Sequence, residues 1–118
     1  GSLMYYNPLL SSASRVARLL KAMSNDRRLR ILCYLSERER SVGELCELIE
    51  IGQSALSQHL AKLRGDNIVK TRREAQTVYY SIASPEIYDV LAGLQEVLTG
   101  EEGRTKTLET LQERRSAS

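Results

Sequence analysis

The sequence is poor in the residue types that hold metal ions. It contains one histidine, His59, and two cysteines, Cys33 and Cys46, in 118 residues. A tight transition-metal site needs several nitrogen or sulfur ligands for each ion. We therefore expect no metal and no other cofactor, and we expect the two cysteines to be free thiols.

Groupings of catalytic residues are missing as well. Ser57 and His59 come closest to a nucleophile and a base, but they diverge on a helix and no carboxylate is placed to orient the imidazole. There is also no glycine-rich loop that could hold a phosphate. The sequence therefore predicts a protein that is not an enzyme.

Long apolar runs and targeting signals are absent too. No stretch approaches the roughly 20 apolar residues of a membrane span, and no signal peptide is recognisable. These absences predict a cytoplasmic protein with no membrane partner. The length and the hydrophobic content of 42% suit one domain. We expect this domain at residues 9–99, after a tag remnant and flexible N-terminus at 1–8 and before a polar tail or short helix at 100–118.

The net charge is only +2, but it is unevenly distributed along the chain. From Gln53 to Tyr80 there are five basic residues against two acidic ones, whereas from Glu37 to Glu50 there are two basic residues against five acidic ones. Positive charge gathered on one segment favours contact with nucleic-acid phosphates. This distribution predicts DNA contact along residues 53–80.

The segment from Gln53 to Leu63 has the pattern of a DNA-recognition helix. At about 100° per residue, Leu56, Leu60 and Leu63 form one apolar stripe. The opposite face is uncharged in its first turns, whereas a merely solvated face usually carries Lys and Glu. Glutamine and serine side chains suit base edges in the major groove, and the small Ala61 allows a close approach. We expect the DNA contacts of this helix to come from Gln53, Ser54, Ser57, Gln58, Lys62 and Arg64.

The residues upstream predict a first helix and a turn. Ser41 precedes residues 42–49 as a candidate N-cap, and Glu44 follows it at the spacing of a capping box. Ile51 and Gly52 then make the turn. A helix, a tight turn with glycine and a second helix form a helix-turn-helix, in which the second helix enters the DNA groove.

Two β-prone runs follow the recognition helix, at residues 68–73 and 77–82. They predict a hairpin, or wing. Its tip at 74–76 lacks the Asn-Gly or Asp-Gly of a tight two-residue turn, so we expect a looser loop. Basic and polar residues around the tip are expected to reach DNA, the alternative being an ordinary surface hairpin; they are Arg72, Arg73, Gln76 and Thr77.

The outer parts of the domain are expected to be helical, with one apolar face each. Ser24 or Asn25 is a candidate cap for a helix that contains Cys33, and Ser84 and Pro85 suit a terminal helix start. The predicted fold is mainly α with a small β-hairpin, a winged helix-turn-helix in the order α-α-α-α-β-β-α. We assign the outer apolar faces to a twofold homodimer interface, with packing in the chain's own core as the alternative for each residue; they comprise Val16, Leu19, Leu20, Met23, Ile87, Val90, Leu91, Leu94 and Leu98.

Four segments, Leu19–Leu32, Ser41–Leu45, Gln53–Leu63 and Arg73–Tyr80, closely resemble the ArsR/SmtB family of bacterial repressors. Within that family the chain is most similar to the branch of HlyU, NolR, BigR and SqrR. The resemblance covers most of the chain from Ala13 to Leu98. It implies a dimeric winged-helix repressor that binds double-stranded promoter DNA, and a twofold dimer implies an inverted-repeat operator. HlyU-like relatives also make an antagonist plausible, which displaces another DNA-bound regulator and so activates transcription.

The resemblance also bears on what the protein senses. Metal-sensing relatives use a Cys-x-Cys pair or Asp and His ligands on the terminal helix, and neither set is present here; His59 is interpreted as a packed residue. Thiol-responsive relatives pair one cysteine on the second helix with one on the terminal helix. Cys33 matches the first, but Thr99 stands at the second, which leaves Cys46 as the substitute partner. A persulfide- or oxidant-responsive repressor is therefore one alternative, and two buried, unreactive cysteines are the other.

Overall fold

The computed structural model of the protein describes residues 7–100. Most of the expected N-terminal extension at 1–8 and nearly all of the expected tail at 100–118 lie outside these residues. The chain divides into two compact units, with the boundary between Ser84 and Pro85.

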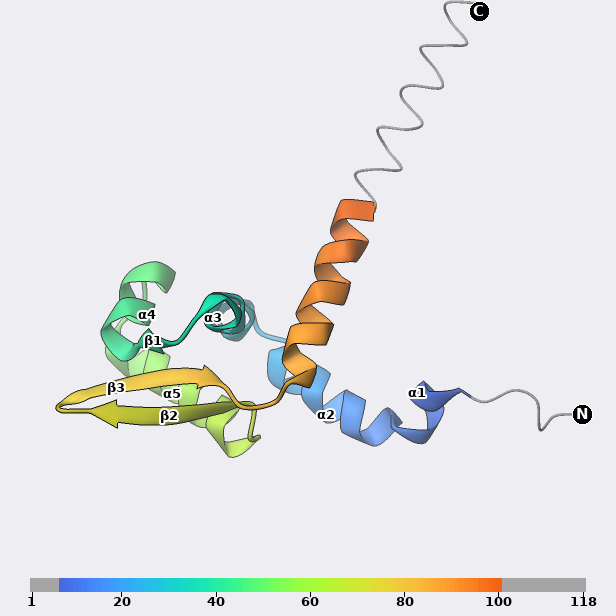
Figure 1. Cartoon of the computed structure of the whole chain (residues 1–118), viewed down its shortest axis with the longest axis horizontal. Helices are drawn as coiled ribbons and strands as arrows, with labels where there is room; N and C mark the ends of the chain where they lie inside the picture. Colours follow the sequence, from blue (N-terminus) through green and yellow to red (C-terminus); the bar gives the residue numbers. More distant parts are fainter. Residues whose placement is uncertain (1–6, 101–118) are drawn as a thin grey trace, which may run out of the picture. The chain divides into compact units, whose positions relative to one another are not determined.

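The first unit is mainly helical and contains one small sheet (Figure 1). The expected winged arrangement is confirmed, with a short first helix and a short first strand in addition. In chain order the elements are α1 (Pro8–Ser11), α2 (Ala13–Met23), α3 (Asp26–Glu37), β1 (Arg40–Ser41), α4 (Val42–Ile49), α5 (Gln53–Gly65), β2 (Val69–Glu74) and β3 (Thr77–Ile82).

Side-chain caps start α3 and α4 where the sequence indicates. Of the two candidates for α3, Asn25 is the N-cap, and its side chain accepts hydrogen bonds from the backbone N–H groups of Arg27 and Arg28. The Ser41 hydroxyl accepts a bond from the Glu44 N–H at 3.1 Å, which confirms the predicted start of α4. In the turn after α4, the left-handed residue is Glu50 (φ 59°), whereas Gly52 has an ordinary φ of −71°. Ile51 and Gly52 thus lie in the turn as predicted, but the left-handed conformation falls on Glu50 and not on the glycine.

The sheet has three antiparallel strands in the order β1-β3-β2. The sequence predicted only the two strands of the hairpin. The third strand, β1, pairs with β3 through Arg40↔Tyr80 and Ser41↔Tyr79. This strand connects the segment before α4 directly to the wing.

The hairpin tip differs from the expected loose loop. Glu74 pairs with Thr77, so only Ala75 and Gln76 lie between the strands. Ala75 adopts a positive φ of 56°, which a tight hairpin turn requires at its first position. Strand pairing thus enforces a turn that the residue types at the tip do not favour.

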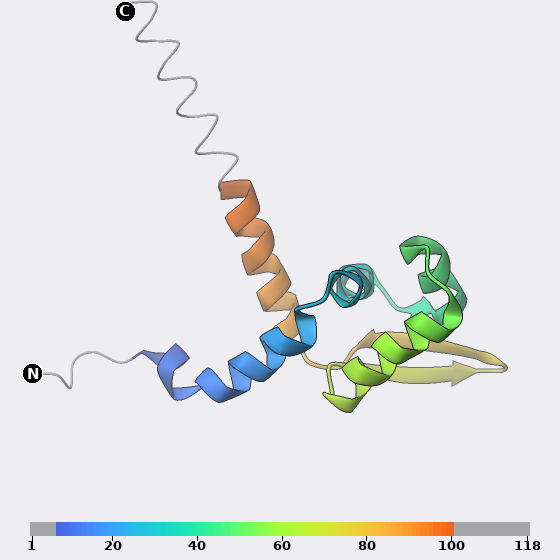
Figure 2. The same cartoon turned by 180° about the vertical axis from the view of Figure 1, so that it is seen from behind.

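The core lies between the helices and one face of the sheet. Helices α3, α4 and α5 pack on one another, α3 and α4 contact β3, and α5 contacts β2. Figure 2 shows α5 crossing the hairpin. The apolar stripe of α5 is confirmed, since Leu56, Leu60 and Leu63 are all fully buried.

In the second unit, residues 86–100 are helical. Ile87 is buried, Val90 and Leu91 are half-buried, and Leu94 and Leu98 are exposed. Within the described part of the chain, no helix has the length and apolar character needed to cross a membrane.

Candidate nucleic-acid interface

The polar face of α5 is open to solvent. Its predicted base-contacting residues are all exposed, namely Gln53, Ser54, Ser57 and Gln58. The buried leucines on the opposite side fix the helix against the core. The side chains on the open face can therefore turn toward an outside partner without loss of core packing.

The N-terminus of α5 is also open. Its N-cap is Gly52, and no side chain caps the first turn. The first N–H groups of a helix have no partner within the helix, and together with the helix dipole they attract anions such as phosphates. Acidic residues are absent from this first turn, whereas Lys62 and Arg64 lie in the last one.

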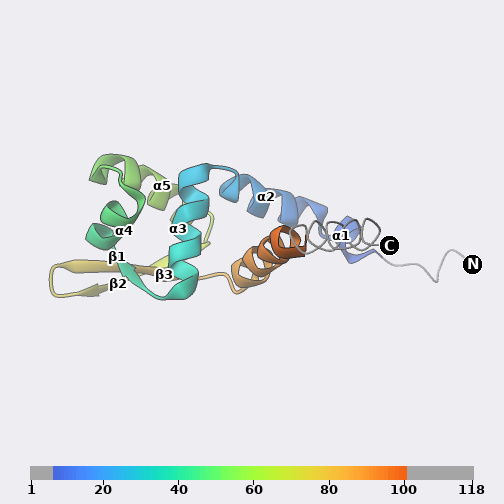
Figure 3. The same cartoon turned by 90° about the horizontal axis from the view of Figure 1, so that it is seen from above.

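The turn between α4 and α5 and the tip of the hairpin lie at the same end of the first unit (Figure 3). The exposed start of α5 and the tip residues Gln76 and Thr77, also exposed, can thus face one partner together. This is the arrangement in which a winged helix-turn-helix uses its second helix and its wing on the same DNA.

The basic residues predicted to hold phosphates differ in what they contact. Lys62 forms an ion pair with Asp66 at 3.5 Å. The side chains of Arg64 and Arg73 are exposed, and neither forms a hydrogen bond or an ion pair with any residue in the range 7–100.

Arg72 is engaged with two carboxylates. Its Nε and Nη2 atoms donate to the two carboxylate oxygens of Glu39 at 3.0 and 2.7 Å, and Nη1 donates to Glu74 at 2.9 Å. The guanidinium also lies over the Tyr79 ring, 4.6 Å from its centroid. The hydrogen bond from Arg72 lowers the pKa of Glu39, and the bonds to Glu39 and Glu74 raise the pKa of Arg72. Sequence reasoning did not find this cluster, because Glu39 lies 33 positions away.

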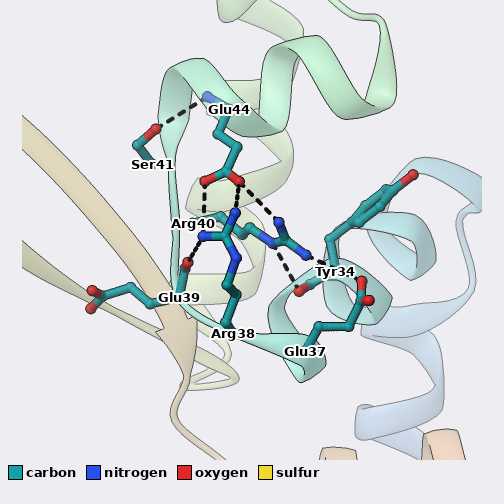
Figure 4. A network of polar contacts seen from close by, with 7 residues as sticks. All are labelled: Tyr34, Glu37, Arg38, Glu39, Arg40, Ser41 and Glu44. Carbon is teal, nitrogen blue, oxygen red and sulfur yellow. Dashed lines mark hydrogen bonds and ion pairs between the residues drawn. The ribbon is translucent and has the colours of Figure 1, made fainter.

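A second polar cluster surrounds Arg40, the one charged residue in the described chain that is buried (Figure 4). Its guanidinium donates to the Tyr34 carbonyl at 3.2 Å, to Glu44 at 2.9 Å and to Glu37 at 3.2 Å. Arg38 also bonds to Glu44, and these bonds lower the pKa of the Glu44 carboxyl. The cluster ties the end of α3, strand β1 and the first turn of α4 together, and so places the helix-turn-helix on the sheet. Two arginines within a run of glutamates were its only signal in the sequence.

The two cysteines are not alike. Cys33 is exposed in the single chain, so its interpretation as a buried core thiol is wrong, whereas Cys46 is half-buried. Although Cys33 is exposed, protein atoms around its sulfur exclude part of the solvent, and this desolvation raises the pKa of the thiol. The neighbouring Glu37 raises it further. Both effects oppose formation of the reactive thiolate.

His59 is half-buried on α5. Desolvation lowers its pKa, with smaller contributions from Arg28 and Arg27 on α3. This environment agrees with a packed, neutral histidine. No group of three or more metal-ligating side chains occurs among residues 7–100.

The predicted dimer residues fall into two classes. Met23 and Ile87 are already buried in the single chain. The others are partly or fully open. Val16, Leu19, Val90 and Leu91 are half-buried, and Leu20, Leu94 and Leu98 are exposed.

Comparison with known proteins agrees with this geometry. The model of the family described as "Bacterial regulatory protein, arsR family" matches residues 25–71, from the N-cap of α3 into β2. The transcriptional activator HlyU of Vibrio cholerae is 52% identical over 87 residues, which are 74% of this chain and 81% of the relative.

Solved structures give the same result. Reduced HlyU from Vibrio cholerae superposes with a TM-score of 0.71 at 48% identity, covering 78% of this chain and 97% of that one. The transcriptional repressor BigR from Xylella fastidiosa has a TM-score of 0.73 at 39% identity, covering 76% and 92%. The homodimeric winged helix-turn-helix DNA-binding domain of Mb0332 from Mycobacterium bovis has a TM-score of 0.71 at 29% identity, covering 85% and 93%. The chain therefore belongs to the arsR family of bacterial regulatory proteins, and it is a DNA-binding transcriptional regulator with a winged helix-turn-helix, not an enzyme.

Proposed function

We propose that this regulator is a repressor that binds an inverted-repeat operator as a homodimer. The observation that carries the proposal is the exposed polar face of α5, which is uncharged in its first turns, with the uncapped N-terminus of the helix at the same end of the unit as the hairpin tip. Glutamine and serine can read base edges, and free N–H groups can hold the adjacent phosphates. Acting on promoter DNA, the protein would work in the cytoplasm.

The residue roles follow from position on α5 and on the wing. Gln53 and Ser57, with Ser54 and Gln58, read bases. Lys62, Arg64 and the wing hold phosphates and so set the register on DNA without reading its sequence. Gln76 and Thr77 at the hairpin tip make further contacts with the sugar-phosphate backbone of the DNA.

The homodimer rests on the apolar residues that stay uncovered in the single chain. Leu20 on α2 and Leu94 and Leu98 on the terminal helix are exposed, and large apolar side chains in such numbers favour burial between subunits. The homodimeric Mb0332 domain supports this assignment. Two recognition helices related by a twofold axis then require half-sites about one DNA turn apart, or a multiple of it.

A charge in the interface tests the dimer. Leu94→Glu would place an unpaired carboxylate in the contact, so sedimentation should show a monomer and operator affinity should collapse. Gln95→Glu adds the same charge to the next residue, which is exposed, and should leave both properties unchanged. A dimeric Leu94→Glu protein with normal affinity would refute the assigned interface.

A change in the spacing between the two half-sites tests whether the operator is an inverted repeat. Binding sites are first selected from random DNA with the purified protein, and affinity is then measured after the insertion of about 5 base pairs between half-sites, which is half a helical turn. We expect a strong loss on insertion, because the dimer fixes the distance between its two recognition helices. An inserted full turn adds about 34 Å between the half-sites and should not restore affinity. Selection of a single half-site without symmetry would contradict the proposal.

Activation by displacement of another regulator is the second candidate, and the name of the similar transcriptional activator HlyU favours it. Transcription in vitro with RNA polymerase separates the two. A repressor lowers transcription from its own promoter when added alone. A displacing activator has no effect alone and raises transcription only after a competing DNA-binding protein has silenced the promoter.

Thiol control by Cys33 is weak or absent in our proposal, because partial desolvation and the charge of Glu37 both disfavour its thiolate. Operator affinity is measured with intact mass before and after persulfide or peroxide treatment, with Cys33→Ser and Cys46→Ser as controls. A large loss of affinity together with a Cys33–Cys46 linkage, abolished by either substitution, would instead establish a thiol switch.

A further inference from the structure

Two adjacent arginines of the wing lie on opposite faces of the sheet. Val69 and Ile82 are paired across β2 and β3, and both are buried, so they mark the face that the helices cover. Side chains alternate between faces along a strand. Arg73 therefore shares the helix-covered face with Val69, and Arg72 lies on the outer face.

On the outer face, Arg72 has little capacity left for a phosphate. Three of its N–H groups are bound by Glu39 and Glu74, and one guanidinium face lies on Tyr79. Two carboxylates around one guanidinium also leave the local charge negative. A DNA phosphate would meet repulsion from Glu39 and Glu74 before it could displace them.

On the other face, Arg73 is exposed and has no hydrogen-bonding partner in the described part of the chain. It belongs to β2, which is the strand that α5 contacts. Its guanidinium keeps all five donors available for a bidentate contact with phosphate. Because α5 lies on the same face of the sheet, a contact made by Arg73 is compatible with α5 in the major groove.

From this asymmetry we propose that Arg73 is the wing arginine that holds DNA phosphates, and that Arg72 is a positioning residue clasped by Glu39. This inference rests on the proposed binding of DNA by α5 and the wing. Glu39 precedes β1, so the Glu39–Arg72 pair joins the segment that leads into α4 to the strand β2 of the hairpin. The clasp sets the position of the wing relative to the helix-turn-helix, and both must reach the same DNA.

The first experiment compares two cations on one strand, Arg73→Gln and Lys70→Gln. Lys70 lies on the outer face and is exposed, so it serves as the matched control for loss of one positive charge. DNA affinity is measured by fluorescence anisotropy from low to high salt. We expect Arg73→Gln to reduce the slope of log affinity against log salt by about 1 per subunit. Lys70→Gln should keep the wild-type slope, and equal slopes for the two variants would overturn the inference.

The second experiment removes the clasp without changing the net charge. The double variant Glu39→Gln/Arg72→Gln should keep the wild-type salt slope and lose about two- to fivefold in affinity for cognate and random DNA alike. Charge reversal by Glu39→Arg/Arg72→Glu should recover part of that loss, since the pair forms again with opposite polarity while Glu74 repels the new carboxylate. A slope reduced by about 1 per subunit in the double variant would show that Arg72 itself contacts phosphate. Tighter binding by Glu39→Gln/Arg72→Gln would likewise refute a positioning role.

A third arm separates failure of this inference from failure of the proposed function. Gln53→Ala is measured on the same DNA, and circular dichroism confirms that every variant is folded. If Gln53→Ala weakens cognate binding while Arg73→Gln does not change the slope, α5 binds DNA and only the division of roles between the arginines is wrong. If neither variant affects binding, the proposed DNA interface is wrong, and so is the assignment of roles to Arg72 and Arg73.

Discussion

The two helices of the helix-turn-helix begin in opposite ways. At the start of α4, the Ser41 side chain caps the first turn, and Glu44 in that turn is bound by Arg38 and Arg40. At the start of α5, Gly52 provides no side-chain cap, and the first turn carries no acidic residue.

This difference separates a supporting element from a binding element. The polar groups at the start of α4 are bound within the chain, and they fix α4 to α3 and β1. The polar groups at the start of α5 are open, although the same helix is firmly anchored by three buried leucines. A rigid helix with an open N-terminus can bind an anion without first breaking internal bonds.

Removal of Arg40 should have the largest effect on stability, because Arg40 holds the start of α4 against α3. Arg40→Met takes the donors away from Glu44, Glu37 and the Tyr34 carbonyl, and we expect the free energy of unfolding to fall by about 2–3 kcal/mol. Urea denaturation measures this loss. Arg38→Met removes an exposed partner of the same Glu44 and should have little effect. Equal losses in the two variants would show that burial of Arg40 is not what matters.

Gln53→Ala should affect the binding element alone. We expect a loss of about 1–3 kcal/mol in binding to the cognate operator, little change on random DNA and unchanged stability, because Gln53 is exposed. Glu47→Ala, at an exposed position of α4, is the control and should change neither property. Equal weakening on cognate and random DNA would contradict base reading by Gln53.

Ser41→Ala tests how much the side-chain cap contributes to the stability of α4. Loss of the hydroxyl leaves the Glu44 N–H without its acceptor, and unfolding should become easier by about 1 kcal/mol. Thermal unfolding measures the change. Stability equal to that of the wild type would mean that the arginine cluster alone secures this helix start.

A cap added to α5 should have the smallest effect on stability and the opposite sign. The backbone at Gly52 is extended and no atom lies within 4 Å of an added Cβ, so Gly52→Asp can cap α5 and stabilise the fold by a few tenths of a kcal/mol. The same carboxylate would repel phosphate, so DNA affinity should fall. Gly52→Asn supplies a cap without the charge and should retain more affinity. Unchanged affinity in Gly52→Asp would show that phosphates do not approach this end of α5.

Much of the fold was predictable because it depends on local pattern. The spacing of Leu56, Leu60 and Leu63 defines a buried face, and Ser41 and Asn25 satisfy N–H groups only two or three residues away. The same local spacing separated the polar face of α5 from its core face. These features therefore followed from the sequence alone, as did the limits of both hairpin strands to within one residue.

What the tertiary structure alone decided depends on partners distant in sequence. The register between β2 and β3 places Ala75 at a positive φ, against its own preference. The path of the chain through β1 brings Glu39 to Arg72, which lies 33 positions away. The same path buries Arg40, although the two carboxylates that Arg40 binds lie only three and four residues from it. Exposure of Cys33 was equally hidden, because a helical period shows which residues share a face but not which face the rest of the chain will cover. Local periodicity thus determined the elements and their faces, whereas sheet register and chain path determined which charges are bound within the protein and which remain free for DNA.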